Sequence, residues 1–221
     1  MKTEAVIFDM DGVISDTQKV HAETECMLFR EYGITITPEE NTKRFAGVPD
    51  PEAFEIIFRE AGKPSPDFDT LILRKWELMF KISPERIAPI PGIFELVRNL
   101  RTRQIPLAVA SSSRLDFIQL VLKSLGFSND FTVLVSTDEV ENGKPAPDIF
   151  LLAAARLHVS SAQCAVIEDG LSGMTAAKRA GMHCIGLLTH VSESESPADV
   201  NVRSLQDLKL DMLGIPAPKR M

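Results

Sequence analysis

From Pro91 onward, short apolar runs alternate with stretches whose apolar residues recur at helical spacing. This alternation constrains the fold more than any other feature of the chain, because strands joined by helices form a parallel sheet covered on both faces. An earlier run, Ala5–Phe8, is apolar at every position, as in a strand buried on both faces. We therefore predict an α/β fold with a parallel sheet. Its strands are expected at residues 5–8, 105–110, 132–135, 164–167 and 184–188.

Residues 16–88 interrupt this alternation and carry only helical patterns. Residues 17–32 end at Gly33, which suits a helix C-cap. Thr37 followed by Pro38 and two glutamates has the form of a helix start. Further helices are expected near residues 50–61 and 68–82. We therefore predict a small all-helical domain over residues 16–88, inserted after the first strand of a core formed by residues 1–15 and 89–221.

The composition limits the classes of partner. The chain has 221 residues and a formal net charge of −7, which argues against nucleic acid or an anionic membrane as a partner. No apolar run approaches the roughly 18 residues that a membrane span needs, and no signal-peptide pattern precedes the first strand. Cys26, Cys164 and Cys184 form no CxxC pair or ligand cluster. We therefore expect these cysteines to be buried in the core as small hydrophobic side chains. We expect a cytoplasmic monomer.

Polar side chains follow the predicted strands at the point where each strand ends. Because these ends meet at one edge of a parallel sheet, the side chains are expected to converge. Each also has an ordinary explanation: serines cap helices, loop lysines are solvated, and acids compensate a helix dipole. Together, however, they supply a nucleophile, an acid–base group, hydroxyls, a cation and metal ligands. They are Asp9, Asp11, Ser111, Ser112, Ser113, Lys144, Glu168 and Asp169.

The first of these strand ends carries two carboxylates close together. Asp9 and Asp11 are two residues apart, and Gly12 lets the chain turn sharply beside a ligand. Two neighbouring carboxylates repel each other, and burying them unpaired is costly. A hard cation such as Mg²⁺, which prefers oxygen ligands, would relieve that cost.

Four motifs contain these residues. They are Phe8-Asp9-Met10-Asp11-Gly12-Val13 with Asp16-Thr17, then Ala110-Ser111-Ser112-Ser113, Gly143-Lys144-Pro145-Ala146-Pro147-Asp148 and Val166-Ile167-Glu168-Asp169-Gly170. In content and order they resemble the motifs of the haloacid dehalogenase superfamily, in its β-phosphoglucomutase-like subgroup with a helical cap. The resemblance covers nearly the whole chain, and it implies a Rossmann-like core with a cap inserted after the first strand.

The resemblance also implies roles for these residues. Asp9 would be the nucleophile that forms an aspartyl-phosphate, and Asp11 the general acid and base. Superfamily members that remove halide lack the second aspartate, so Asp11 indicates phosphoryl transfer. Mg²⁺ would be held by Asp9, by the main-chain carbonyl of Asp11, by Asp169, and by Glu168 directly or through water. The phosphate would be bound by Ser111, Ser112 and Lys144.

In this subgroup the cap closes over the site and selects substrates. His21 matches a histidine of the mutases, and Lys75 lies in a stretch that resembles their cap lysine. The mutases also carry a glycine followed three positions later by an arginine that grips a second phosphate. Here Gly47 is followed at that position by Asp50, an acid that should repel a second phosphate unless Lys43, Arg44 or Lys75 compensates for it.

This departure favours a phosphatase over a mutase. We therefore expect a Mg²⁺-dependent phosphatase that hydrolyses a small phosphorylated metabolite, with a sugar phosphate as the expected substrate. The alternative is a sugar phosphomutase of the β-phosphoglucomutase type, which would need a bisphosphate activator. A third interpretation, a non-catalytic phospho-aspartate switch, shares the acids, hydroxyl and lysine. Such receiver domains, however, carry their aspartate deeper in the chain and have no inserted cap.

Overall fold

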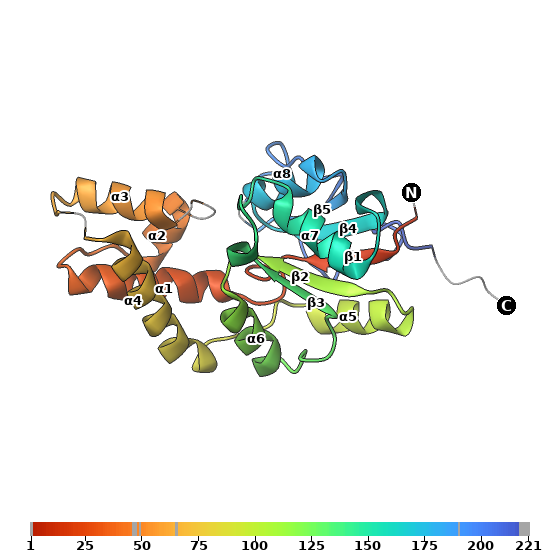
Figure 1. Ribbon diagram of the computed structural model, residues 1–221, viewed down its shortest axis with the longest axis horizontal. Helices are drawn as coiled ribbons and strands as arrows, with labels where there is room; N and C mark the ends of the chain where they lie inside the picture. Colours follow the sequence, from red (N-terminus) through yellow and green to blue (C-terminus); the bar gives the residue numbers. More distant parts are fainter. Residues whose placement is uncertain (1, 46–47, 49, 65, 190, 217–221) are drawn as a thin grey trace. The chain divides into compact units, whose positions relative to one another are not determined.

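The computed structural model describes residues 2–45, 48, 50–64, 66–189 and 191–216. The chain divides into two compact units (Figure 1). The first, here called the core unit, comprises Met1–Ser15 and Ala88–Met221. The second, here called the helical unit, comprises Asp16–Ile87. Each unit is described by itself.

The core unit is built on a six-stranded sheet in the order β3-β2-β1-β4-β5-β6, and every neighbouring pair is parallel. The parallel sheet and its five predicted strands are confirmed. The sixth strand was not predicted, because it is only three residues long and has the polar Asn201 at its centre. The strands are β1 (Ala5–Phe8), β2 (Leu107–Ser111), β3 (Val133–Ser136), β4 (Cys164–Glu168), β5 (His183–Leu187) and β6 (Val200–Val202).

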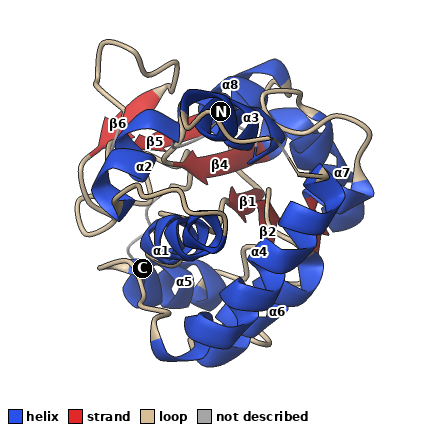
Figure 2. Ribbon diagram, turned by 90° about the vertical axis from the view of Figure 1, so that its left-hand side faces the viewer, coloured by secondary structure: helices blue, strands red, loops and turns tan. Residues whose placement is uncertain are grey.

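Helices cover both faces of this sheet (Figures 1 and 2). On one face, Ile7 of β1 packs in a cluster with Phe150 and Met174, and on the other Phe8 meets the ring of Phe131 at 5.5 Å. Both faces of β1 are therefore buried, and burying such side chains contributes about 1.5–3 kcal/mol each. The helices are α5 (Ile93–Thr102), α6 (Leu115–Ser124), α7 (Asp148–Leu157) and α8 (Leu171–Arg179), with 3₁₀ turns at Thr137–Glu139 and Ser161–Gln163.

The order of the strands defines a switch point between β1 and β4. From β1 the chain adds β2 and β3 on one side of the sheet, and then β4, β5 and β6 on the other. In open α/β sheets, ligands bind outside the carboxyl ends of the strands that flank such a point. The residues that follow β1 and those that end β4 are therefore placed where a ligand site is expected.

The described residues of the helical unit form four α-helices, as the sequence predicts. Thr37 Oγ1 accepts the N–H of Glu40 at 3.1 Å, which is the predicted cap of the second helix. Phe29 packs edge-on against Phe54 at 5.1 Å and belongs to the apolar core of the unit. The helices are α1 (Thr17–Glu31), α2 (Pro38–Phe45), α3 (Asp50–Glu60) and α4 (Phe68–Ile82), followed by a 3₁₀ turn at Ser83–Glu85.

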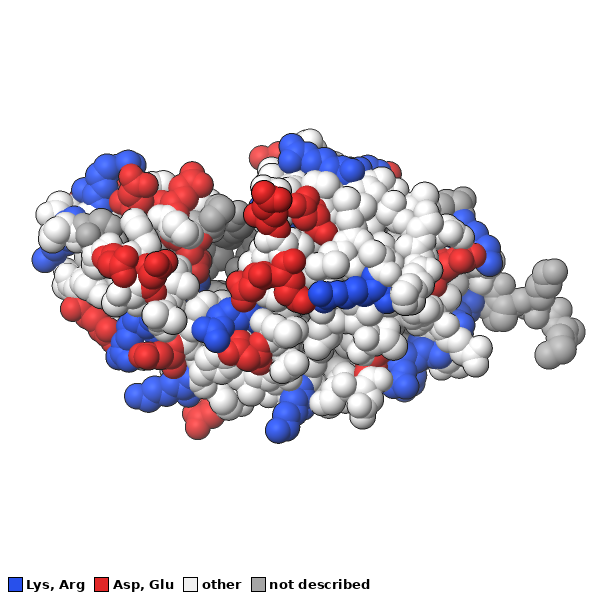
Figure 3. Space-filling view, in the orientation of Figure 1, with Lys and Arg blue, Asp and Glu red and all other residues white. Residues whose placement is uncertain are grey.

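Cys26, Cys164 and Cys184 are buried free thiols, as predicted. Burial raises the pKa of each of them. None of the helices in the described ranges has the length and apolar character that a membrane crossing requires. On the face drawn in Figure 3, lysines and arginines are interspersed with acidic side chains and form no single basic patch.

Candidate active site

Three buried carboxylates meet at the switch point of the sheet. Asp9 follows β1 directly, Glu168 is the last residue of β4, and Asp169 comes next. Phe8 pairs in register with Ile167, which brings Asp9 and Glu168 side by side. Asp9, Glu168 and Asp169 are 6%, 3% and 5% exposed, and one oxygen of each lies within 4.8 Å of the others. The predicted convergence of these three acids is present in the structure.

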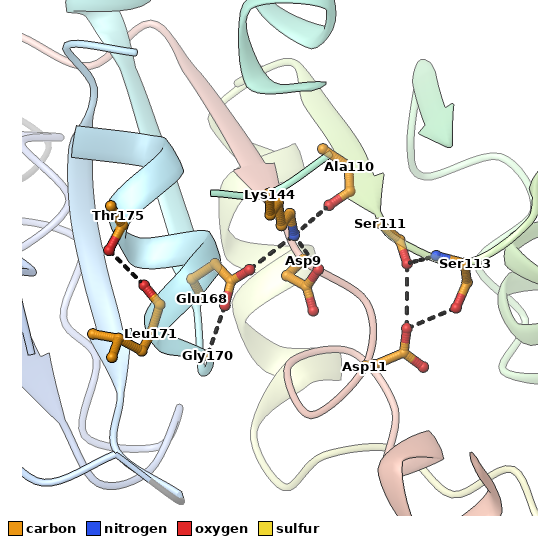
Figure 4. Close-up of polar contacts among 10 residues, drawn as sticks. All are labelled: Asp9, Asp11, Ala110, Ser111, Ser113, Lys144, Glu168, Gly170, Leu171 and Thr175. Atoms are coloured by element: carbon orange, nitrogen blue, oxygen red, sulfur yellow. Dashed lines mark hydrogen bonds and ion pairs between the residues drawn. The ribbon is translucent and has the colours of Figure 1, made fainter. Parts of the chain in front are cut away.

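Lys144 reaches this cluster from the loop before α7 (Figure 4). Its Nζ donates to Asp9 Oδ1 at 2.6 Å, to Glu168 Oε1 at 2.8 Å and to the carbonyl of Ala110 at 3.1 Å. The ammonium also lies 4.9 Å from the ring centre of Phe150, and the side chain is 5% exposed. Lys144 is therefore a buried partner of two carboxylates and not a solvated loop lysine.

The charges of this cluster do not balance. Three ionised carboxylates and one ammonium carry a formal charge of −2. Burial raises the pKa of Asp9 to about 8, against the attraction of Lys144 and with added repulsion from Glu168. Burial and the charge of Glu168 also raise the pKa of Asp169. Burial alone would lower the pKa of Lys144, but the charges of Asp9 and Glu168 outweigh it and raise that pKa.

The donor set fits a divalent cation, which would neutralise the remaining charge. Asp9 offers Oδ2, which has no hydrogen-bond partner among the described residues, while its Oδ1 accepts from Lys144. Glu168 is more occupied, because Oε1 accepts from Lys144 and Oε2 accepts from the N–H of Gly170 at 2.7 Å. Asp9 and Asp169 are thus the better placed ligands, and Glu168 holds Lys144 beside Asp9.

Two glycines make room for these carboxylates. Gly12 has a φ of +83°, and a Cβ there would lie 2.1 Å from Asp169 Oδ2. Its N–H donates to the carbonyl of Ser15 at 2.8 Å, which closes the sharp turn that the sequence predicts. Gly173 lies within α8, where glycine costs about 1 kcal/mol relative to alanine. A Cβ there would lie 1.6 Å from Glu168 Oε1, so the position of the Glu168 side chain requires this glycine too.

Asp11 turns its side chain toward the end of β2. The carboxylate is half-buried, and its Oδ2 accepts from Ser111 Oγ at 3.2 Å and from Ser113 Oγ at 2.9 Å (Figure 4). Ser111, the last residue of β2, is fully buried. Ser112 is exposed and makes no side-chain hydrogen bond within the described part of the chain. The structure thus joins Asp11 to Ser111, and the phosphate contact expected of Ser112 stays a prediction.

The sequence motifs give no individual role to Ser113, Thr189 or Gly173. Ser113 belongs to a run of three serines, but the sequence does not say where each hydroxyl points. Thr189 comes shortly after β5, and its Oγ1 donates to Asp169 Oδ2 at 3.1 Å. Thr189 could have been predicted, because polar residues that follow the strands of a parallel sheet lie at the same edge as the site. Gly173 gives no signal of its own, because only the fold brings it against Glu168.

The candidate cap residues His21 and Gly47 have no structural evidence for a role toward substrate. His21 lies on α1 of the helical unit, half-buried, with its ring edge-on to Trp76 at 5.9 Å. Gly47 lies outside the described residues. For both, a role toward substrate stays a prediction.

Lys75 and Asp50, the other two candidates, form an ion pair inside the helical unit. Lys75 Nζ lies 2.7 Å from Asp50 Oδ2 and 2.7 Å from Glu25 Oε1, and its side chain is 2% exposed. Glu25 in turn accepts from the amide of Asn41. These four residues come from α4, α3, α1 and α2, so one polar network links all four helices of the unit.

Comparisons with known proteins agree with this geometry. The family model described as haloacid dehalogenase-like hydrolase matches residues 6–187. The chain is 36% identical over 218 residues to a beta-phosphoglucomutase of Bacillus subtilis, covering 95% of this chain and 93% of that protein. It is 35% identical over 187 residues to a phosphorylated carbohydrates phosphatase of Thermotoga maritima, covering 85% and 86%.

Solved structures show the same fold. The structure of CbbY from Rhodobacter sphaeroides in complex with phosphate matches with a TM-score of 0.84 at 27% identity, covering 96% of this chain and 100% of that one. The family model spans most of the chain. The acids and the lysine of the motifs lie together at the switch point of the sheet. The chain therefore belongs to the haloacid dehalogenase-like hydrolases, and its similarity includes the β-phosphoglucomutase-like members.

Proposed function

We propose that this protein is a Mg²⁺-dependent phosphatase that hydrolyses a small phosphorylated metabolite, with a sugar phosphate as the expected substrate class. The observation that carries the proposal is the buried cluster in which Lys144 lies between Asp9 and Glu168, beside Asp169. Relatives named as a phosphorylated carbohydrates phosphatase and a beta-phosphoglucomutase support a phosphorylated carbohydrate.

In the first step, Asp9 is the nucleophile. One oxygen of the Asp9 carboxylate, which Lys144 holds in place, attacks the phosphorus and forms an aspartyl-phosphate while the bond from phosphorus to the ester oxygen breaks. Asp11, in its acid form, gives its proton to that leaving oxygen. The dephosphorylated alcohol then leaves the site.

In the second step, water attacks the same phosphorus atom. Asp11, now a carboxylate, takes a proton from the water as the new bond forms. The bond between phosphorus and the Asp9 oxygen breaks, which releases inorganic phosphate and restores the Asp9 carboxylate. Asp11 ends the cycle in its acid form, so protons and charges balance.

A phosphate dianion must approach an acidic cluster for this chemistry to occur. Lys144, Ser111 and Ser112 are the residues we assign to its oxygens. Asp9, Asp169, Glu168 and the main-chain carbonyl of Asp11 would hold Mg²⁺, which would supply positive charge to stabilise the transferring group. The formal charge of −2 on the cluster supports this assignment.

A phosphomutase is the second candidate, and the 36% identity to a beta-phosphoglucomutase favours it. A mutase must hold a second phosphate. The cap has Asp50 at the position we expect for the gripping arginine, and Lys75, a candidate to compensate for it, is already paired with Asp50 and Glu25. With two carboxylates on one lysine, this cluster offers no net positive charge to a phosphate. The pairing supports the phosphatase.

A phosphate-release screen separates these candidates. The full chain is assayed on a panel of sugar phosphates and other small phosphate esters with MgCl₂, with EDTA, and with MgCl₂ plus glucose 1,6-bisphosphate. We expect release that requires Mg²⁺ and does not respond to the bisphosphate. Interconversion of hexose 1- and 6-phosphates that appears only with the bisphosphate would make the protein a mutase. Stable phosphorylation without turnover on any ester would make it a phospho-aspartate switch.

A further inference from the structure

The contacts of Asp11 lead to one more inference, which rests on the proposed function. Two hydroxyls, Ser113 Oγ at 2.9 Å and Ser111 Oγ at 3.2 Å, both point at the same oxygen of Asp11, Oδ2 (Figure 4). An oxygen that accepts two hydrogen bonds is a poor place for the proton of a carboxylic acid. The proton of the acid form therefore belongs on Oδ1.

The main chain of Ser113 is fixed from two sides. Its N–H donates to Ser111 Oγ at 3.0 Å, and its carbonyl accepts from Ser136 Oγ at 2.9 Å. Because Ser111 Oγ accepts that N–H, its own proton is free to face Asp11. Ser113 is 3% exposed, and Ser111 and Ser136 are fully buried, so water has little access to the hydroxyls that make these bonds.

Ser136 is itself held by the turn that follows β3. Its N–H donates to Glu139 Oε2 at 2.9 Å, and its hydroxyl accepts the N–H of Asp138 at 3.2 Å. Glu139 is paired with Arg156 at 2.7 Å. The edge of the sheet at β3 is thus connected through Ser136 and Ser113 to Asp11.

We propose that Ser113 is a positioning residue, which holds Asp11 Oδ2 so that the proton sits on Oδ1 and reaches the leaving oxygen. Ser111 shares the contact but also faces the phosphate site, whereas Ser113 is dedicated to Asp11. Ser136 keeps Ser113 in place. In this scheme Ser113 contributes to the step that needs a general acid and not to the binding of the phosphate.

The test measures kcat/KM of the full chain with Mg²⁺ on two esters that differ in leaving group. An alkyl phosphate needs protonation of its leaving oxygen, and p-nitrophenyl phosphate hardly does. For Ser113→Ala we expect about a tenfold loss on the alkyl ester, the size of a lost hydrogen bond to a carboxyl group that becomes charged as it gives up its proton, and less than about a threefold loss on the nitrophenyl ester. Ser136→Ala should show the same pattern with a smaller loss. Ser124→Ala, an exposed serine at the end of α6, is the matched control and should behave as the wild type.

A double-mutant cycle checks that Ser113 acts through Asp11. In an Asp11→Ala background, Ser113→Ala should cause no further loss. Equal losses on both esters, or losses that add to those of Asp11→Ala, would assign Ser113 to substrate binding and overturn the proposal. A Ser113→Ala protein without a cooperative unfolding transition would overturn it too, because the hydroxyl would then be structural. Wild-type protein that releases no phosphate from any ester would refute the proposed function itself, a different result.

Discussion

Each unit of this protein buries one lysine between two carboxylates. In the core unit, Lys144 lies 2.6 Å from Asp9 and 2.8 Å from Glu168. In the helical unit, Lys75 lies 2.7 Å from both Glu25 and Asp50. Each ammonium also faces an aromatic ring, Phe150 at 4.9 Å and Phe54 at 5.8 Å respectively. At the level of contacts the two clusters look alike.

Their surroundings differ. The Asp9 and Glu168 side chains are 9% and 4% exposed and have the buried Asp169 beside them. In the helical unit, the Glu25 and Asp50 side chains are 14% and 31% exposed, so water still reaches them. The core cluster therefore keeps an excess of buried negative charge that a bound cation can neutralise. The same kind of ion pair lies in the proposed active site of one unit and joins four helices in the other.

The largest expected effect comes from removing the nucleophile. Asp9→Asn keeps the size of the side chain but loses its nucleophilic carboxylate, so kcat/KM should fall about 10⁴-fold or more, as for other catalytic nucleophiles. Phosphate release under saturating Mg²⁺ measures this. Asp207→Asn, at an exposed position of the C-terminal segment, should leave the rate unchanged. An Asp9→Asn protein that works at the wild-type rate would exclude Asp9 as the nucleophile.

The next effect concerns the lysine of the core cluster. Lys144→Met should lower kcat by about 10²–10³-fold, because a preorganised positive group at the transferring phosphate is lost. Circular dichroism should show a folded chain under the conditions of the assay. The control is Lys123→Met, an exposed lysine on α6. A loss seen only in KM would mean that Lys144 binds substrate without stabilising the transition state.

The lysine of the helical unit should respond in the opposite way. Lys75→Met leaves Glu25 and Asp50 without their cation, and we expect a loss of about 2–4 kcal/mol in the free energy of unfolding. This lies below the value for fully buried pairs because the Asp50 side chain is 31% exposed. The fluorescence of Trp76, the single tryptophan of the chain, reports this unit during urea unfolding.

Lys81→Met, an exposed lysine of the same helix, is the matched control for Lys75. The turnover number of folded Lys75→Met protein should change by less than Lys144→Met changes it. If Lys75→Met were as stable as the wild type and as inactive as Lys144→Met, the contrast between the two clusters would be wrong.

The smallest effect is a pH dependence of the protein without metal. The pKa of Asp9 is raised by burial to about 8 from an ordinary value of 3.8, so the native state holds its proton more tightly than the unfolded state. Stability therefore falls as the pH rises through this window, because the unfolded state binds fewer protons. In EDTA, Tm should decrease between pH 6 and pH 8.

Mg²⁺ should raise Tm more at pH 8 than at pH 6, since it binds the ionised carboxylates. Thermal unfolding followed by circular dichroism measures both series. The Asp9→Asn protein should lose part of the decrease seen in EDTA, the rest being due to the raised pKa of Asp169. An equal effect of Mg²⁺ at both pH values would place the cation away from this cluster.

Much of the fold and the centre of the site could be predicted from the sequence. Apolar runs such as Ala5–Phe8 identify buried strands, and the parallel topology then brings Asp9, Lys144, Glu168 and Asp169 together. What could not be predicted depends on side-chain direction. The sequence does not say that Ser113 points to Asp11 and Ser112 to solvent, because the turn after β2 decides it.

Tertiary packing hides other features. Lys75 is a charged residue on an amphipathic helix, and only the assembled helical unit shows that Glu25 and Asp50 bind it. Gly173 appears unfavourable within a helix until Glu168 is seen to occupy the space of its Cβ. The strand β6 is too short, and Asn201 too polar, for periodicity to reveal it.

The covalent state of Asp9 during turnover tests the account most directly. Wild-type protein is mixed with a substrate from the screen and Mg²⁺, quenched in acid within the first turnover, and digested for mass spectrometry. We predict one phosphoryl group on the peptide that contains Asp9, removable by hydroxylamine as an acyl phosphate is, and absent from Asp9→Asn protein. A phosphoryl group on Ser111 or on any other residue, with Asp9 unmodified, would contradict the account.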